Sequence, residues 1–216
     1  YVVYTSETNA FLAQLPLIQE KVVDILRSSP ADLVHAEVYL CMRVFLCRFA
    51  SQHLTGFWPI ILTEMVRILA QAKVDLPADK SDRLQLVFSV VKLADFLITL
   101  QTDDFQIHQW LLITDTPDAT NPASSYMADS LLDCLAKFVS ECQRELVFDA
   151  NDSLERAQQR RPLLQMSSVA TISTLQPFFA TASRAFYQCD FHATLDWDNI
   201  NACLLHDLFE PIHTNT

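Results

Sequence analysis

The sequence predicts an all-α protein, and three observations support this class: composition, hydrophobic periodicity and residues that cap helices. Half of the 216 residues are hydrophobic and 19% are charged, so the chain can bury a sizeable core and lacks the composition of a disordered segment. It has one glycine, Gly56, where average usage of about 7% would give roughly fifteen. Turn-rich β folds, glycine-rich phosphate loops and nucleophile turns all need more glycine than this, so they are disfavoured.

Two helices are predicted in the first 50 residues. The first extends from about Glu7 to Arg27, and Pro16 should kink it or start its second half. The segment Ser29-Pro30-Ala31-Asp32 then has the features of a helix start, with a capping hydroxyl, a proline and an acidic first turn. The helix that follows, to about Ala50, is apolar nearly all round, so we expect it to be central and covered on most sides.

The rest of the chain is predicted to form further helices joined by short connectors. Their expected ranges are Phe57–Lys73, Ser81–Gln101, Asp103–Leu112, Pro122–Phe148, Ser173–Gln188 and a last helix to Phe209 capped by Asp196 or Asp198. Residues 114–122 are the clearest loop, and 151–162 are a long loop or a frayed helix end. We therefore expect one domain, residues 1–216, of about eight helices with α-solenoid-like (HEAT/armadillo-like) stacking, although no fixed-period repeat proves such an array.

Charge and cysteine content narrow the environment and the partners. The formal net charge is −11, which disfavours nucleic acid as a partner. The chain opens on Tyr1 and shows no signal peptide, so we interpret it as part of a longer cytosolic protein with its six cysteines reduced. The uncharged run from Pro162 to Ser183 is too rich in Ser, Thr, Gln and Pro to be a membrane-spanning helix.

The sequence predicts neither a metal site nor an active site. Cys189-x-x-His192 and Cys203-x-x-His206 are two Cys/His pairs that zinc could use. Cys203 and His206 flank two leucines of an amphipathic helix, however, and Cys189 ends another helix, so core cysteine is the favoured interpretation. No sequence context places a base beside a nucleophile, and we expect no metal, no cofactor and no enzymatic activity.

Two groups of basic residues are the remaining functional lead. The first lies in or beside the polar segment before Pro162 and consists of Arg156, Arg160 and Arg161; the second surrounds the break at Pro77 and consists of Lys73, Lys80 and Arg83. Arginine suits phosphate monoesters, and a loop leaves it free to reach them. Lipid phosphate is the candidate ligand of the first group and, less strongly, of the second; the alternatives for such clusters are a solvated surface and the capping of helix C-termini.

Arg43 and Arg48 require a different explanation, because both lie on the apolar helix that begins near Asp32. A buried guanidinium needs carboxylate or carbonyl partners. We expect each to form a structural ion pair, with Glu37, Glu64 or Asp95 as the carboxylate.

Several segments resemble the C-terminal region of the Dopey family of large cytosolic trafficking proteins. These segments are Val38–Arg48 (VYLCMRVFLCR), Ser51–Pro59 (SQHLTGFWP) with Thr63-Glu64, Lys92–Leu97 (KLADFL), Asp104–Trp110 (DFQIHQW) with Ile113–Asp115 (ITD), Arg161–Leu164 (RPLL) and Leu175–Phe179 (LQPFF). They follow one another along nearly the whole chain. The combination of Gln-His-Leu-Thr with Trp-Pro is fairly specific, whereas the leucine-rich helices are not.

The resemblance implies a non-enzymatic factor that is peripheral on Golgi and endosomal membranes. It implies binding of phosphatidylinositol 4-phosphate by this region, a large Golgi scaffold related to Arf exchange factors as a partner, and organelle positioning by conventional kinesin for the full protein. It does not supply a lipid-binding motif that can be carried onto numbered positions. A phosphoinositide-binding membrane adaptor and a protein-interaction or homodimerisation module therefore both remain open.

Overall fold

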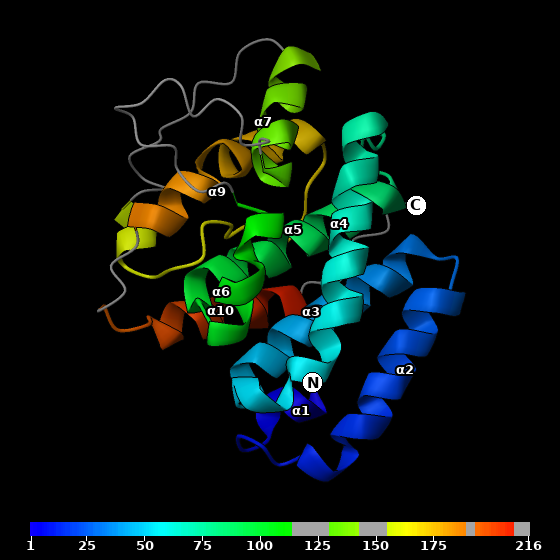
Figure 1. Ribbon diagram of the computed structural model, residues 1–216, viewed down its shortest axis with the longest axis vertical. Helices are drawn as coiled ribbons and strands as arrows, with labels where there is room; N and C mark the ends of the chain where they lie inside the picture. Colours follow the sequence, from blue (N-terminus) through cyan, green and yellow to red (C-terminus); the bar gives the residue numbers. More distant parts are fainter. Residues whose placement is uncertain (114–129, 143–154, 189–192, 210–216) are drawn as a thin grey trace.

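The computed structural model describes residues 1–113, 130–142, 155–188 and 193–209, and in these ranges every regular element is helical (Figure 1). The α-helices are α1 (Val2–Thr5), α2 (Leu15–Ser28), α3 (Asp32–Arg48), α4 (Trp58–Val74), α5 (Asp82–Leu100), α6 (Asp103–His108), α7 (Leu131–Cys142), a turn at 155–158, α9 (Gln176–Gln188) and α10 (Trp197–Phe209). The all-α prediction is confirmed. Residues 114–122, predicted to be a loop, lie outside the described residues.

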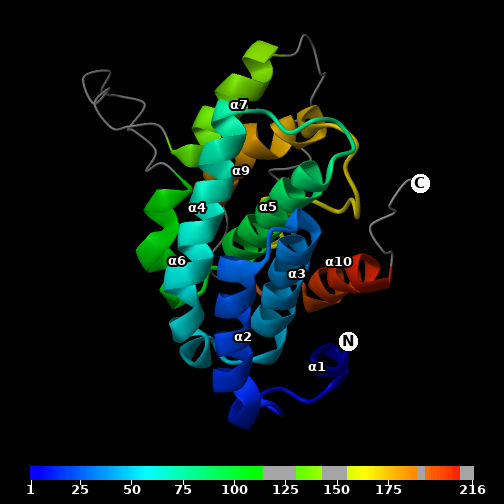
Figure 2. The ribbon, with the colours of Figure 1, turned by 90° about the vertical axis from the view of Figure 1, so that its right-hand side faces the viewer.

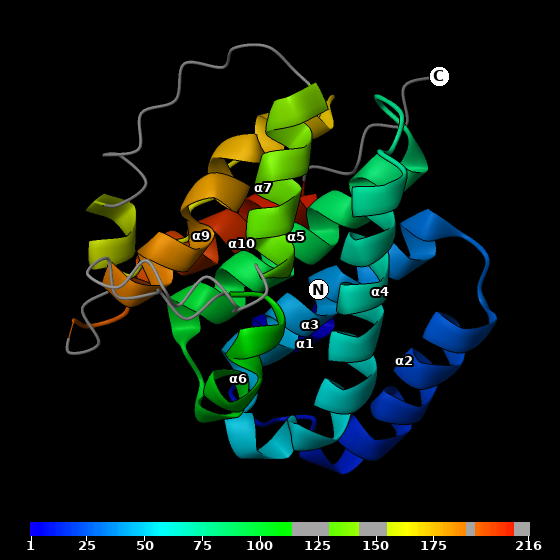
Figure 3. The ribbon, with the colours of Figure 1, turned by 45° about the horizontal axis from the view of Figure 1, so that its top comes forward.

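Successive helices stack against one another with alternating direction. Figure 1 shows α2 rising, α3 descending and α4 rising again, and Figure 2 shows these helices side by side with α10 beyond α3. Seen with the top of the molecule turned forward, α7 and α9 lie together beside α5 (Figure 3). This antiparallel order agrees with the solenoid-like stacking predicted from sequence.

Local signals explain where some of the described helices begin. Pro16 stands in the first turn of α2, so it starts the helix instead of kinking a longer one. Ser81 caps α5, because its hydroxyl accepts a hydrogen bond from the backbone N–H of Leu84 at 3.2 Å. The predicted start at Ser29-Pro30 is wrong: α3 begins at Asp32, and the Ser29 hydroxyl accepts from the backbone N–H of Ala31 ahead of the helix.

The central helix is α5, not the predicted helix near Asp32–Ala50. Sixteen of the 19 residues of α5 are buried, against nine of 17 in α3. Val34, Glu37 and Cys41 are exposed on α3, and their spacing of three and four residues marks one solvent-facing side. In contrast, α5 is covered by α3, α4, α9 and the segment before α9.

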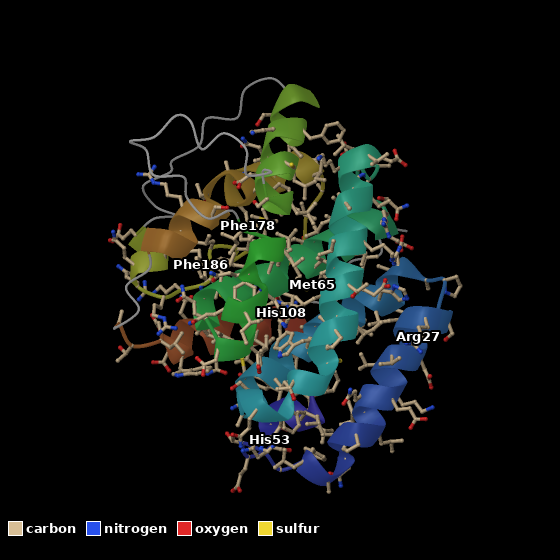
Figure 4. The ribbon with its side chains drawn as sticks, in the orientation of Figure 1. Arg27, His53, Met65, His108, Phe178 and Phe186 are labelled. Atoms are coloured by element: carbon tan, nitrogen blue, oxygen red, sulfur yellow. The ribbon has the colours of Figure 1, made fainter. Side chains whose placement is uncertain are left out.

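Apolar side chains from several helices converge on the region around α5 (Figure 4). Met65 of α4 and Phe178 and Phe186 of α9 are all at most 3% exposed. Arg27 and His53, in contrast, lie at the outer edge of the lower helices in the same view. The phenyl ring of Phe186 also meets that of Phe105 edge to face at 6.3 Å, which connects α9 to α6.

Candidate functional site

An extended segment, residues 160–170, runs antiparallel along α5 and is held there by polar contacts; we call it the strap. Residue numbers increase along the strap in the direction in which those of α5 decrease. At its start, Arg160 donates to the carbonyls of Thr99 and Leu100 (3.3 and 3.0 Å), and the N–H groups of Leu163 and Leu164 donate to Asp95 (3.0 and 2.8 Å). Farther along, Lys92 donates to the Met166 carbonyl (2.7 Å), Gln85 to the Val169 carbonyl (2.9 Å), and the N–H of Lys80 to the Ala170 carbonyl (3.0 Å). Side chains of α5 thus replace the backbone partners that the strap would have in a sheet.

Asp95 is the most deeply buried anchor of the strap. Its side chain is in the interior, and its two oxygens accept the two adjacent backbone N–H groups of Leu163 and Leu164. Burial raises the pKa of Asp95 to about 6, and these two hydrogen bonds oppose the rise without cancelling it. The carboxyl group therefore fixes the register of the strap on α5.

Next to the strap, Arg43 of α3 and Lys92 of α5 converge on Asp207 of α10. One carboxylate oxygen of Asp207 accepts from the Arg43 guanidinium and the other accepts from the Lys92 ammonium. All three side chains are almost fully buried, with exposed fractions of 3%, 3% and 6%. The guanidinium of Arg43 also lies 5.5 Å from the ring centre of Phe96, which adds a cation–π contact. Two cations thus share one carboxylate in the interior.

The electrostatics of this cluster are unfavourable to its second cation. Burial lowers the pKa of Lys92, and the nearby charge of Arg43 lowers it further, while Asp207 opposes both effects. The Nε–H of Arg43 is buried and has no hydrogen-bond partner among the described residues. The cluster therefore has donor capacity beyond what a single carboxylate uses.

A cavity of about 180 Å³ opens beside the cluster, several times the roughly 30 Å³ that a water molecule occupies in the liquid. We call it the basic pocket. Its polar lining consists of Arg43, Lys92, Gln85, Ser89, Ser167, Asp207 and Glu37, of which Glu37 is the exposed one at the rim. The amide, the hydroxyl groups and the two cations are all groups that hydrogen-bond a phosphate or carboxylate anion.

The predicted partners of Arg43 and Arg48 are wrong. Arg43 pairs with Asp207, which is 164 residues away, and Arg48 stacks its guanidinium on the ring of Tyr4 at 4.6 Å. Glu64 is instead paired with Arg67 on its own helix at 2.7 Å, and Asp95 accepts backbone N–H groups. No signal in the sequence selects a carboxylate in the last helix as the partner of Arg43.

The first predicted basic group lies at the start of the strap. Arg160 donates to the carbonyls of the last residues of α5 and to that of Ala193 at 3.2 Å. Its side chain therefore caps the C-terminus of α5 instead of extending into solvent. Arg161 pairs with Asp196 at 2.6 Å and is 41% exposed. Arg156 is half-buried. Binding of lipid by these three arginines stays a prediction.

The second predicted group flanks the turn between α4 and α5 and is balanced by acidic residues. Lys73 and Lys80 are exposed on either side of the turn between α4 and α5. Arg83 pairs with Asp32 at 3.3 Å and donates to the Gln71 side chain. Since Asp75, Asp79 and Asp82 are exposed in the same turn, the region carries no excess of positive charge.

The two Cys/His pairs do not come together in the described part of the chain. Cys189 and His192 lie outside the described residues, while Cys203 is buried on α10 and its thiol contacts the Asn199 side-chain oxygen at 3.8 Å. Within the described ranges, no three His, Cys, Asp or Glu residues are grouped as a metal site would require. The same ranges hold no helix of the length and apolar character needed to cross a membrane.

Lys92 and Asp207 are the residues of the candidate site that the sequence does not single out. Lys92 stands alone as a cation within the apolar run of α5, and Asp207 lies between His206 and Leu208 on α10. A lone charge inside an apolar helix is a signal that a partner must exist. Such a charge indicates that an oppositely charged partner is needed, but it does not indicate which segment of the chain supplies that partner.

Comparison with known proteins identifies the family. A family model described as DOP1 C-terminal matches residues 1–191. The chain belongs to the DOP1 family. The resemblance to the Dopey C-terminal region is thereby confirmed, and it extends over most of the described helices.

Individual relatives are similar along much of this DOP1 domain. It is 28% identical to mouse protein DOP1B over 86% of the chain, and 30% identical to the pad-1 protein of Caenorhabditis elegans over 65%. The dop1 protein of Emericella nidulans is 30% identical over 61%. The chain spans only about a tenth or less of the length of these relatives: 10%, 6% and 7% respectively. No solved structure matches the chain.

Proposed function

We propose that this DOP1 domain is a non-enzymatic membrane-trafficking adaptor that binds a phosphoinositide, with phosphatidylinositol 4-phosphate as the expected lipid, on Golgi and endosomal membranes. The observation that carries the proposal is the basic pocket, in which Arg43 and Lys92 lie beside neutral donors. A large Golgi scaffold related to Arf exchange factors is the proposed protein partner, on the basis of the family resemblance.

The basic pocket suits a phosphate monoester better than a diffuse anionic surface. A planar guanidinium and an ammonium on two different helices can contact the same phosphate from two directions. The amide of Gln85 and the hydroxyls of Ser89 and Ser167 are suited to the hydroxyls of a sugar ring. With a net charge of −11, the domain gains little from general attraction to an anionic bilayer, so recognition must be local.

Vesicle flotation tests the proposal. We expect the domain to float with vesicles containing phosphatidylinositol 4-phosphate and to remain behind with vesicles in which phosphatidylserine supplies the same charge. Lys92→Gln should weaken flotation about tenfold or more, since it removes a charge-assisted hydrogen bond. This variant keeps the Arg43–Asp207 pair, so the fold retains a neutral buried cluster.

Matched variants decide between the basic pocket and the predicted surface groups. Lys73→Gln removes the same charge from an exposed position and should leave flotation unchanged. Arg161→Gln tests whether the first basic group binds the lipid, because Arg161 is partly exposed and its pair with Asp196 contributes little to stability. Equal flotation of all variants would place binding elsewhere, and equal flotation with phosphatidylserine vesicles would overturn phosphoinositide recognition.

A protein-interaction or dimerisation role is the second candidate, and one surface favours it. Tyr1, Val2 and Phe209 are 70%, 64% and 59% exposed, and the rings of Tyr1 and Phe209 meet edge to face at 5.6 Å. Adjacent exposed apolar side chains mark contact surfaces. Sedimentation of the wild type and of Phe209→Ser tests this role: a concentration-dependent dimer lost in the variant would support it, and a monomer at all concentrations would not.

A further inference from the structure

We propose that Asp207 is an internal competitor for the ligand of the basic pocket, and that α10 is displaced when a phosphate monoester binds there. This inference rests on the proposed function and adds its regulation: α10 is a latch whose carboxylate occupies the place of the incoming anion. The ligand chemistry is a phosphate monoester, either in a lipid headgroup or free in solution.

The charge balance of the pocket requires such a displacement. With α10 in place, Arg43 and Lys92 are offset by Asp207 and by Glu37 at the rim, so the pocket has no net positive charge. A phosphate monoester near neutral pH brings between one and two negative charges. Its oxygens and those of Asp207 would compete for the same two cations, and like charges at this separation repel strongly in a buried site.

The orientation of α10 adds to this conflict. Asp207 lies in the last turn of α10, where the unsatisfied carbonyl groups give the helix end a partial negative charge. The end of the helix therefore favours Arg43 and Lys92 as neighbours and disfavours a bound phosphate. Removing α10 takes the competing carboxylate away from both cations at once, so latch opening and anion binding are thermodynamically coupled.

The attachment of α10 is weak enough for it to act as a latch. It has three buried residues, Ile200, Cys203 and Leu204, compared with 16 for α5. Its other described contacts include Leu208 packed against the core, the ring of Phe209 on that of Tyr1, the Tyr4 hydroxyl to Asn201 at 3.4 Å, and the pair of Arg161 with Asp196 just before the helix. Asp207 links α10 to both α3 and α5 through its pairs with Arg43 and Lys92.

Calorimetric titration tests the competition directly. The probe is inositol 1,4-bisphosphate, with inorganic phosphate and phosphatidylinositol 4-phosphate vesicles as parallel arms that distinguish a lipid headgroup from free phosphate. Asp207→Asn should bind the probe about tenfold or more tightly than the wild type, because the competing charge is gone. Asp198→Asn is the matched control, since it removes the same charge from the exposed start of α10.

A second measurement uses the wild type alone and remains valid if Asp207→Asn does not fold. Cys203 is 8% exposed on α10, so its alkylation by iodoacetamide reports opening of the latch, and half-buried Cys47 on α3 serves as the internal reference. Saturating probe should raise the alkylation rate of Cys203 several-fold and leave that of Cys47 unchanged.

Binding of the probe without faster alkylation of Cys203, and without tighter binding by Asp207→Asn, would overturn the latch and leave the proposed function standing. Absence of binding to the wild type and to Asp207→Asn, in solution and on vesicles, would overturn both. Opening by inorganic phosphate alone would support the latch and assign its ligand to free phosphate instead of a lipid.

Discussion

The helices α3 and α4 and the C-terminal part of the chain are attached to the central helix α5 by different chemistry. Between α3, α4 and α5 the contacts are mainly apolar, with fully buried side chains such as Phe57, Met65 and Leu93. The strap and α10 add apolar contacts of their own, but their positions on α5 are set by hydrogen bonds and ion pairs. Apolar packing stabilises the fold but is not directional. Polar contacts, in contrast, define how the segments align, and a competing ligand can replace them.

The largest expected effect comes from the apolar region. Phe57 is fully buried, and its ring lies 5.8 Å from that of Phe45. Phe57→Ala should lower the free energy of unfolding by about 3–5 kcal/mol, because a large cavity replaces the ring. Urea denaturation measures the loss. Val74→Ala, at an apolar position that is 84% exposed, is the control and should change stability by less than about 0.5 kcal/mol.

Asp95 should give the strap a pH dependence that the apolar region lacks. Its pKa of about 6 in the folded protein lies above the ordinary value of 3.8, so the folded state holds more protons between these values. The stability that this group contributes is therefore greatest in acid and falls as pH rises from about 4 to about 6. Compared with Asp95→Asn, the wild type should lose up to about 3 kcal/mol between pH 4 and pH 7.

Urea denaturation of both proteins at several pH values measures this difference. The change of side chain adds a constant offset, because an amide cannot accept from both Leu163 and Leu164 as a carboxylate does. Only the slope against pH is diagnostic. Parallel stability curves for the two proteins would mean that Asp95 titrates as an ordinary exposed carboxyl group.

A smaller effect is expected at the start of the strap. Arg160→Gln removes charge-assisted hydrogen bonds to the carbonyls of Thr99 and Leu100 and should cost about 1.5–3 kcal/mol. Arg161→Gln breaks a partly exposed pair with Asp196 and should cost less than about 1 kcal/mol. Equal costs for the two variants, measured by thermal unfolding, would show that Arg160 has no special role at the end of α5.

The contrast between these regions also explains which features the sequence predicts. Apolar periodicity and the residues at the helix starts predict the bounds of α4 and α5 to within about one residue. A proline stands in the first turn of α4, and Ser81 caps α5. Periodicity alone could not rank α3 and α5 by burial, because both are apolar on most sides and only tertiary packing decides which one is covered. The polar contacts were the least predictable part.

The candidate site depends on those unpredictable contacts. The sequence predicts Arg43 to be a buried cation in need of a partner; Lys92 carries a similar signal but is not singled out there. That both select Asp207 follows only from the path by which the chain returns to α5 after the strap. Arg160 and Arg161 show the converse, because basic residues on a polar segment turned out to be engaged with carbonyls and with Asp196.

Native-state hydrogen exchange tests most directly the claim that the C-terminal attachments can open while the apolar helices remain folded. Amides of Leu163, Leu164 and Leu204 should exchange through local opening, with free energies at least about 2 kcal/mol below those of Leu93 and Met65 and with little dependence on denaturant. The same free energy and the same denaturant dependence for all five amides would contradict the claim, since α10 and the strap would then open only with the whole domain.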